Sequence, residues 1–203
     1  SCTGIRITAP EQKASRQYRG ISAWQQEVDK MIILASQSPR RAELLTQIGV
    51  EFRTVPTTID ESVHPDERAA DYVERVAIAK AKRVHAEFPD CPVLGSDTAV
   101  VIDHILLGKP RDREQGIDML LRLSGRTHEV LTGVAVFAEQ IHYRLNLSRV
   151  TLRNISRQEA AAYWATGEPA DKAGGYAIQG LAAVFVERIE GSYSGIMGLP
   201  LFE

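Results

Sequence analysis

The sequence predicts an α/β fold. Short β-branched runs alternate along the chain with stretches in which apolar residues recur at helical spacing, and turn residues separate the two. With 203 residues, of which 44% are hydrophobic and 25% charged, the chain has an ordinary globular composition. It can bury the core of one sizeable domain, or of two small halves that share a cleft.

Composition also excludes several kinds of function. A net charge of −2 provides no general field for a nucleic-acid polymer or an anionic membrane, so a bound anion must be held by local basic groups. No apolar run approaches the roughly 18 residues of a membrane span, which predicts a soluble protein. Cys2 and Cys91 are too few and too distant in sequence to suggest a disulfide framework or a zinc site, and Cys91 is expected to be a small buried side chain. The five histidines show no ligand spacing and are expected to be ordinary surface or core residues.

Residues 1–30 differ from the rest of the chain. They contain five basic residues, little apolar content and no apolar segment typical of a secretory signal. Met31 stands directly before a strand-like run, so the natural domain is expected to span residues 31–203, with the upstream residues added by cloning or by an extended reading frame. A functional basic tail or an organelle-targeting segment is the less favoured alternative.

The first predicted strand, 32–35, leads into a helix with a clear start. Ser38 is a favourable N-cap, and Pro39 suits the first helical position. Arg40 and Arg41 in the first turn oppose the helix dipole, which favours anions there. Their placement is explained if the free amides and the two guanidiniums bind a phosphate, and the alternative is two solvated arginines.

Two acids follow the second predicted strand, 50–59. Asp60 and Glu61 are either a solvated turn or hard oxygen ligands for Mg²⁺ or Mn²⁺ on a triphosphate. The next helix is predicted to begin near Asp66, and Lys80 continues its apolar stripe instead of lying opposite it. Lys80 therefore either snorkels at the edge of the stripe or contacts a phosphate.

The stretch 92–103 is predicted to be a buried strand with an interruption at 95–98. Asp97 lies in that interruption, and a carboxylate within such a run is costly unless it is paired, hydrogen-bonded or bound to a metal. Asp97 is either a capping residue of a turn between two strands or part of a site. The polar stretches elsewhere in the chain favour a site.

A second cation follows a predicted hairpin return at 104–108. Lys109 lies at a strand-to-helix turn, as Arg40 does. Asp112 and Gln115 resemble a capping box that opens the next helix. Two cations at equivalent turns support an anion site.

The remaining chain is predicted to form a hairpin, a helix and a final strand. These elements are strands at 130–137 and 141–147, a helix from Ser156 to Gly167, and a strand at 181–189. The glycine-rich segment 171–180 would let the backbone approach a ligand closely, and Gln179 could contact a base edge through its amide. The alternative for this segment is a flexible surface loop.

Seven stretches, taken together and in order, match one known family. They are Ala35–Arg41, Ile59–Glu61, Leu94–Thr98, Lys109–Asp112, Asp171–Gly174, Ile178–Gly180 and Gly198–Pro200. Over residues 31–203 the chain thereby resembles the Maf family of nucleoside triphosphate pyrophosphatases. The resemblance implies a single Maf/ITPase-like domain with a mixed twisted sheet, flanking helices and a central nucleotide-binding cleft. It also implies a Mg²⁺ or Mn²⁺ cofactor, a cytoplasmic homodimer, and hydrolysis of a nucleoside triphosphate to its monophosphate and pyrophosphate.

Within that family, residues 171–176 with 178–180 are similar to the branch that acts on dTTP and UTP. The branch preferring 7-methyl-GTP usually lacks the Asp171–Lys172 pair and has Glu where Gln179 stands. The resemblance implies house-cleaning of the nucleotide pool, modified pyrimidine nucleotides included, with a link to cell-division arrest. The chain departs from the family in its 30 extra N-terminal residues and in stopping soon after Gly198–Pro200, where relatives usually continue into a final helix.

The resemblance also implies roles for individual residues. Asp97 is the expected general base and, with Glu61, the expected metal ligand. The cations expected to neutralise the triphosphate are Arg40, Arg41, Lys80 and Lys109, and the positions expected to bind and select substrate are Ser36, Arg40, Arg41, Thr98 and Gln179. Two rival functions remain: a non-enzymatic nucleotide-binding regulator of septum formation, and a pyrophosphatase for 7-methyl-GTP or other modified purines.

Overall fold

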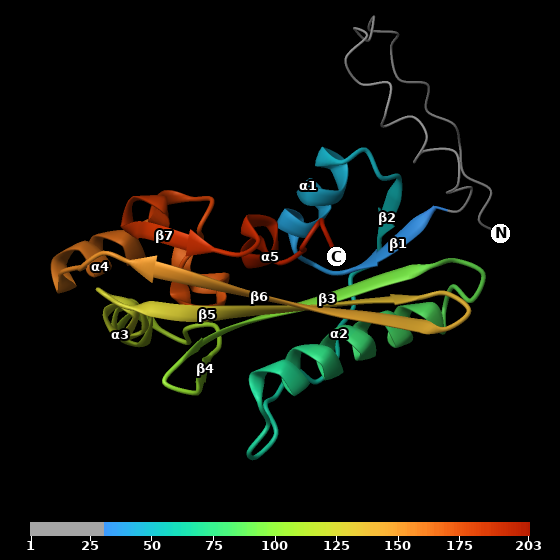
Figure 1. The fold of residues 1–203 in the computed structure, drawn as a ribbon, viewed down its shortest axis with the longest axis horizontal. Helices are drawn as coiled ribbons and strands as arrows, with labels where there is room; N and C mark the ends of the chain where they lie inside the picture. The colour runs from blue at the N-terminus through green and yellow to red at the C-terminus, as the bar shows by residue number, and fades with distance from the viewer. Residues whose placement is uncertain (1–30) are drawn as a thin grey trace, which may run out of the picture.

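A mixed sheet runs the length of the molecule, with helices on both of its faces (Figure 1). The computed structural model describes residues 31–203. The strands are β1 (Ile32–Ala35), β2 (Phe52–Thr54), β3 (Val93–Ile102), β4 (Ile105–Leu107), β5 (Thr127–Phe137), β6 (Ile141–Leu152) and β7 (Val186–Glu190). The helices are α1 (Pro39–Gln47), α2 (Ala69–His85), α3 (Arg113–Leu123), α4 (Arg157–Trp164) and α5 (Tyr193–Met197), with 3₁₀ turns η3 (Glu168–Asp171), η4 (Ala173–Gly175) and η5 (Leu181–Phe185).

The strands follow the order β2-β1-β3-β5-β6-β7, with β4 folded back on β3. β1 pairs in parallel with both β2 and β3, whereas β3, β5, β6 and β7 pair antiparallel. β5 and β6 pair from end to end, which confirms the predicted hairpin at 138–140. The arrangement confirms the predicted α/β class and the mixed sheet.

Side chains of β3 alternate between two differently built faces. Gly95 and Asp97 face α2, whereas Ser96 and Thr98 face the side that carries α1 and α5 (Figure 1). Gly95 lets the backbone of α2 lie directly on the strand, because a Cβ there would be 2.3 Å from the carbonyl oxygen of Ala77. The absence of a side chain at this one position therefore sets the distance between helix and sheet.

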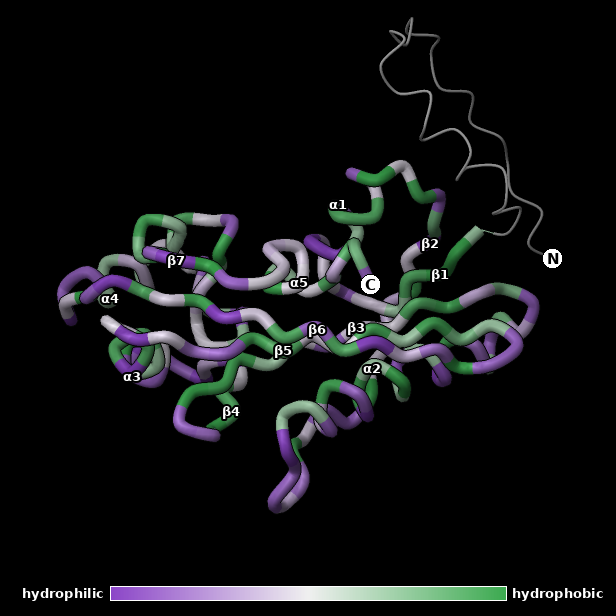
Figure 2. Tube along the Cα trace, in the orientation of Figure 1, coloured by the Kyte–Doolittle hydropathy of each residue, from purple (hydrophilic) through white to green (hydrophobic). Residues whose placement is uncertain are grey.

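A cleft lies where one edge of β3 is left unpaired. β1 pairs with this edge as far as Gly95, and β4 pairs with it only from Val100 onward. Within residues 31–203, no strand pairs with this edge between those two positions. In open α/β sheets, ligands bind beside the carboxyl ends of strands where neighbouring connections diverge. The loop that leads into α2, on one side of this gap, is strongly hydrophilic (Figure 2).

Strand β3 is continuous, so the predicted interruption at 95–98 is wrong. Every residue from Val93 to Val101 pairs with a residue of β5. Tertiary contacts explain the small and polar residues that suggested a turn. Gly95 accommodates α2, and the polar side chains after it have partners on both faces of the sheet. Tertiary contacts have overridden the local preference for a turn.

Several element boundaries also differ from prediction. β2 is three residues long instead of spanning 50–59, α2 begins at Ala69 instead of near Asp66, and α4 ends at Trp164 instead of Gly167. The predicted strand 181–189 is the 3₁₀ turn η5 followed by β7. The sequence does not predict α5, because five residues are too few to show a helical period.

The expectations for residues 1–30, and for Cys2 among them, fall on residues that the structure does not describe. Cys91 is buried in the apolar cluster between α2 and β1, as predicted, but it is not a free thiol. Across residues 31–203, none of the helices is both long and apolar enough to cross a membrane.

Replacing Gly95 by alanine tests how closely α2 must approach β3. The new Cβ would lie 2.3 Å from the Ala77 carbonyl oxygen and 2.8 Å from the Ala81 nitrogen, and backbone atoms can yield only if the whole helix shifts. We expect Gly95→Ala to lower the free energy of unfolding by about 3 kcal/mol, measured by urea denaturation, because overpacking of a core is costly. Gly108→Ala is the matched control, since a Cβ there meets nothing within 4 Å; it should change stability by less than about 0.5 kcal/mol. Equal losses in the two variants would contradict the close packing of α2.

Candidate active site

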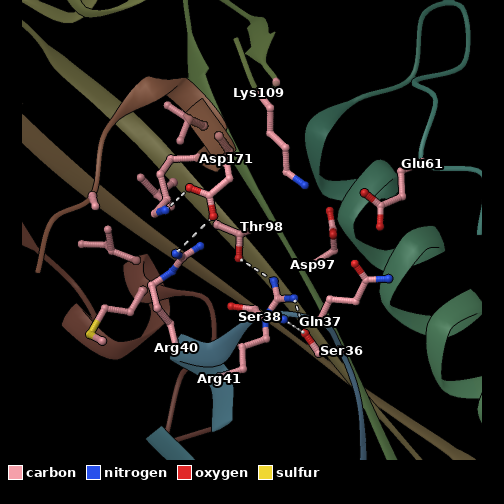
Figure 3. A pocket seen from close by; sticks show the side chains of 18 of the residues that line it. Ser36, Gln37, Ser38, Arg40, Arg41, Glu61, Asp97, Thr98, Lys109 and Asp171 are labelled. Carbon is pink, nitrogen blue, oxygen red and sulfur yellow. Dashed lines mark hydrogen bonds and ion pairs between the residues drawn. The ribbon is translucent and has the colours of Figure 1, made fainter. Parts of the chain in front are cut away.

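A cleft of about 730 Å³ opens at the unpaired edge of β3 (Figure 3). Its walls come from the turn between β1 and α1, the loop before α2 with α2 itself, β3, the turn after β4, and the segment between α4 and β7. All nine candidate residues predicted from the sequence line it: Ser36, Arg40, Arg41, Glu61, Lys80, Asp97, Thr98, Lys109 and Gln179. A cavity of this volume accommodates a small-molecule ligand.

Lys80 joins the two predicted acids of the cleft. Its Nζ lies 2.7 Å from Asp97 Oδ1 and 2.7 Å from Glu61 Oε1. The side chains of Lys80 and Asp97 are only 8% and 10% exposed. Snorkelling of Lys80 is therefore excluded, because its ammonium is buried and paired. Charges this deeply buried are tolerated only when each has its partner.

Glu61 reaches this ion pair from the loop that precedes α2. The Tyr72 hydroxyl donates a hydrogen bond of 3.2 Å to the Glu61 carbonyl oxygen and thereby fixes the backbone of the loop to α2. Burial favours the neutral form of the Glu61 side chain, but the hydrogen bond and charge of Lys80, aided by Lys109 and Arg41, hold the pKa of Glu61 below its ordinary value. Glu61 is therefore a carboxylate at neutral pH.

Glu61 and Asp97 fit a divalent cation as a pair of oxygen donors. Each places an oxygen 2.7 Å from the same Lys80 nitrogen, so the two carboxylates lie in the same part of the cleft. Within residues 31–203, no group of three or more His, Cys, Asp or Glu side chains could cage a metal. Mg²⁺ is commonly held by one or two carboxylates, with substrate phosphates and water as its other ligands. The donor set therefore suits a metal that binds together with a phosphorylated substrate.

Arg41 supports the cleft from its buried side. Its Nε donates to the carbonyl oxygen of Gly198 at 2.8 Å, and its two terminal nitrogens donate to Ser36 Oγ at 3.2 Å and Thr98 Oγ1 at 3.4 Å. Burial lowers the pKa of the guanidinium, and the charge of Asp97 opposes that effect. Arg41 is thus not the solvated side chain that was the alternative, because it is buried and connects three elements of the protein. Its contact with a phosphate stays a prediction.

The same contacts hold α5 against the cleft. The Gly198 carbonyl also accepts a hydrogen bond of 2.9 Å from Ser96 Oγ. Thr98 Oγ1 lies 2.9 Å from Thr132 Oγ1, which in turn donates to the carbonyl oxygen of Gly195 at 2.7 Å. The sequence offers no sign of this arrangement beyond the glycine that ends α5, so sequence analysis missed Ser96 and Thr132.

Cations line the opposite wall. Arg40 lies 4.0 Å from Asp171, which also pairs with Lys172, and Lys109 points into the cleft (Figure 3). Asp171 and Lys172 have no role among the predicted site residues, although both line the cleft. The available signal was an acid–base pair separated by one alanine from two glycines.

The start of α1 has the features of an anion site. Ser38 occupies the N-cap, as predicted, but its side chain makes no capping hydrogen bond, and the first turn contains no acid. Ser36 Oγ instead accepts a hydrogen bond of 3.0 Å from the Ser38 backbone nitrogen. First-turn amides without a side-chain cap are available to an anion.

A buried histidine supports the cleft from behind. His128 Nε2 lies 2.7 Å from the hydroxyl of Tyr176, and the two rings meet edge to face. Tyr176 lines the cleft. In the described part of the chain, the buried Nδ1 of His128 has no hydrogen-bond partner. His128 is thus a core residue, as predicted for the histidines, and burial lowers its pKa to about 4.

The chain is similar to a group of known proteins over this whole region. The family model described as "Maf-like protein" matches residues 31–203. A dTTP/UTP pyrophosphatase of Alkalilimnicola ehrlichii is 55% identical over 185 residues, covering 88% of this chain and 92% of that protein. A dTTP/UTP pyrophosphatase of Saccharophagus degradans is 54% identical over 177 residues, covering 85% of this chain and 84% of that protein. Among solved structures, a nucleoside-triphosphatase described as a dITP/XTP pyrophosphatase of Mycobacterium abscessus aligns with a TM-score of 0.44 and 16% identity, over 62% of this chain and 75% of that one.

The buried His128 makes stability depend on pH. Its pKa is lowered from 6.5 to about 4 in the folded protein, so between these values the unfolded chain binds more protons and stability falls as pH falls. Comparing urea unfolding of the wild type and His128→Asn near pH 7 and near pH 4.5 isolates this contribution, because the carboxylates titrate in both proteins. We expect the stability advantage of the wild type over the variant to shrink by about 2 kcal/mol at the lower pH. An advantage that is equal at both pH values would contradict a buried neutral imidazole.

Proposed function

The chain belongs to the Maf family, and from that premise we propose that it hydrolyses dTTP and UTP to the nucleoside monophosphate and pyrophosphate. Relatives that carry the name dTTP/UTP pyrophosphatase are 55% and 54% identical to it over most of its length. The observation that carries the proposal is the Asp97–Lys80–Glu61 group in the cleft, because two acids held by one ammonium, with cations on the other walls, suit a hydrolase that acts on phosphates.

The cations of the cleft suit a triphosphate. Arg40 and Lys109 line the wall opposite α2, and the uncapped start of α1 adds backbone donors. In our proposal these groups bind the β- and γ-phosphates, which leave together as pyrophosphate and must be stabilised as charge develops on them. Ser36 and Thr98 accept hydrogen bonds from Arg41 and so hold its guanidinium in a fixed position.

Asp97 is the general base in this proposal. Because Lys80 donates to Oδ1 of Asp97, we assign proton transfer to Oδ2. Asp97 takes a proton from a water molecule while the oxygen of that water attacks the α-phosphorus. The bond between the α-phosphorus and the oxygen that bridges to the β-phosphate breaks, and the bridging oxygen leaves with pyrophosphate. Glu61 and Asp97 would together hold Mg²⁺ or Mn²⁺, which supplies charge neutralisation on the phosphates.

The rival proposal of a nucleotide-binding regulator explains less of the cleft. Binding a triphosphate requires the cations but gives no reason to place Asp97 and Glu61 beside it, since like charges repel. Burying the Asp97 carboxylate is also costly and uses Lys80 as its partner, which a protein that only binds a nucleotide does not need. The acids therefore favour an enzyme.

Further expectations accompany the proposed activity. They are a cytoplasmic location, a homodimer, and removal of modified pyrimidine nucleotides from the pool with an effect on cell division. Each follows from the resemblance to the family and stays a prediction.

Asparagine in place of Asp97 tests the assignment of the base. The amide keeps the size of the side chain but cannot accept the proton of the attacking water. We expect Asp97→Asn to reduce pyrophosphate release from dTTP and UTP by at least about 100-fold with Mg²⁺ or Mn²⁺ present.

The matched control is Asp118→Asn, which removes a carboxylate from the exposed face of α3, where it pairs with Arg157. This variant should keep wild-type turnover, and circular dichroism should show both variants folded. Full turnover by Asp97→Asn would refute the assignment. If the wild type binds nucleotides yet releases no pyrophosphate from any of them, the protein is the binding regulator.

Replacing Gln179 by glutamate tests recognition of the base. A carboxylate accepts hydrogen bonds but cannot donate one to a pyrimidine carbonyl. We expect Gln179→Glu to lower kcat/KM for UTP and dTTP by about 10-fold or more, relative to a purine nucleotide, in a panel of nucleoside triphosphates. Gln140→Glu makes the same chemical change in the exposed β5–β6 hairpin and should leave the profile unaltered. An unchanged profile for Gln179→Glu would remove this residue from the recognition of the base.

A further inference from the structure

Gln179 lies on a turn that is held by hydrogen bonds to residues outside the cleft. The turn is closed by a hydrogen bond of 3.0 Å from the Gly180 nitrogen to the Ala177 carbonyl oxygen, and the Gln179 side chain is exposed at the cleft. The groups that hold the turn are Tyr163 of α4 and Glu168 of η3. Neither of them lines the cleft.

One carboxylate holds both ends of the turn. Glu168 Oε2 accepts a hydrogen bond of 3.0 Å from the Leu181 nitrogen, after the turn. Glu168 Oε1 accepts one of 2.7 Å from the Tyr163 hydroxyl, whose oxygen in turn accepts one of 3.1 Å from the Ala177 nitrogen, before the turn. The backbone on either side of Gln179 is therefore tied, directly or through Tyr163, to Glu168.

Gly180 leaves the space that this carboxylate occupies. A Cβ at position 180 would lie 2.2 Å from Glu168 Oε2. The φ of Gly180 is −106°, which any residue can adopt, so the glycine is required by the carboxylate and not by the backbone conformation. The Glu168 carboxylate therefore occupies the space that a side chain at position 180 would need.

The side chains of Tyr163 and Glu168 are themselves held in fixed positions. Tyr163 is buried and packs edge to face against Phe185, with ring centroids 5.6 Å apart. Burial opposes ionisation of Glu168, but the hydrogen bonds from Tyr163 and from the backbone of η5 hold its pKa below the ordinary value. Glu168 is therefore an ionised acceptor, and its hydrogen bonds are stronger than those between neutral groups.

An amide selects between bases only if its position is controlled. The N3–H and O4 of uracil match the oxygen and NH₂ of a glutamine, whereas the larger ring system of a purine brings its hydrogen-bonding edge to a different place. We propose that Glu168 and Tyr163 are positioning residues that fix the Ala177–Gly180 turn, so that Gln179 lies where the edge of uracil or thymine meets it. This inference rests on the proposed function, because it assumes that a pyrimidine triphosphate binds in the cleft.

The test compares kcat/KM for UTP and for GTP in the 203-residue protein and its variants. Glu168→Gln replaces one acceptor oxygen by an NH₂ group, and Tyr163→Phe removes the link to Ala177. In both variants we expect the ratio of kcat/KM for UTP to kcat/KM for GTP to fall by about 10-fold, the effect of losing one hydrogen bond in the positioning network. The loss should appear mainly in KM for UTP, with kcat changed by less than about three-fold, because neither residue touches the phosphates. In the double variant the effects should be less than additive, since both residues act through the same turn.

Glu159→Gln is the matched control. Glu159 also accepts hydrogen bonds from backbone and side chain, but at the other end of α4, in the capping box with Ser156. This variant should be less stable in urea but should keep the wild-type ratio of kcat/KM for UTP to kcat/KM for GTP. An unchanged ratio in folded Tyr163→Phe and Glu168→Gln, or an equal change in Glu159→Gln, would overturn the inference. If Glu168→Gln does not fold, Tyr163→Phe decides. Failure of the proposed function is a different result, because the wild type would then release no pyrophosphate from UTP.

Discussion

The structure depends on placing a carboxylate inside a sheet. Asp97 lies in the middle of β3 with its side chain 10% exposed, and such a charge is unfavourable unless a cation lies beside it. Lys80 on α2 supplies that cation, and this helix lies directly on the sheet. Gly95 and Gly133 provide this approach: added Cβ atoms would lie 2.3 Å and 2.7 Å from carbonyl oxygens of α2. Two missing side chains on neighbouring strands thus permit one buried ion pair.

The broken edge of the sheet makes that ion pair accessible. Had β1 or β4 continued along β3, residues 96–99 would be covered by another strand, and the site would be an ordinary core. Because β1 ends opposite Gly95 and β4 ends opposite Val100, the connections after both strands diverge around Asp97. The same gap admits side chains from segments far apart in sequence, so a cleft forms without a second domain.

Much of this could be predicted from the sequence, and the failures share a physical cause. The hairpin and the start of α1 follow from local chemistry, which the sequence carries directly, whereas candidate residues such as Ser36 and Thr98 come from the resemblance to the Maf family. The interruption in β3 was expected because Gly95 and its neighbours suit a turn, yet their partners are Lys80 and the Gly198 carbonyl, distant groups that no local pattern contains. The supporting role of Arg41 was hidden in the same way, since its acceptors lie on three different elements.

The register of β3 carries as much of the site as the identity of its residues. Asp97 points to α2 and Thr98 to Arg41, so the two faces of one strand contribute to the same cleft. A shift of one residue would exchange the faces and place the carboxylate against the guanidinium, away from Lys80. Gly95 opposes that shift, because the larger side chain of Leu94 would then have to occupy the space against the backbone of α2. The glycine that allows the helix to approach therefore also determines which residue the helix meets.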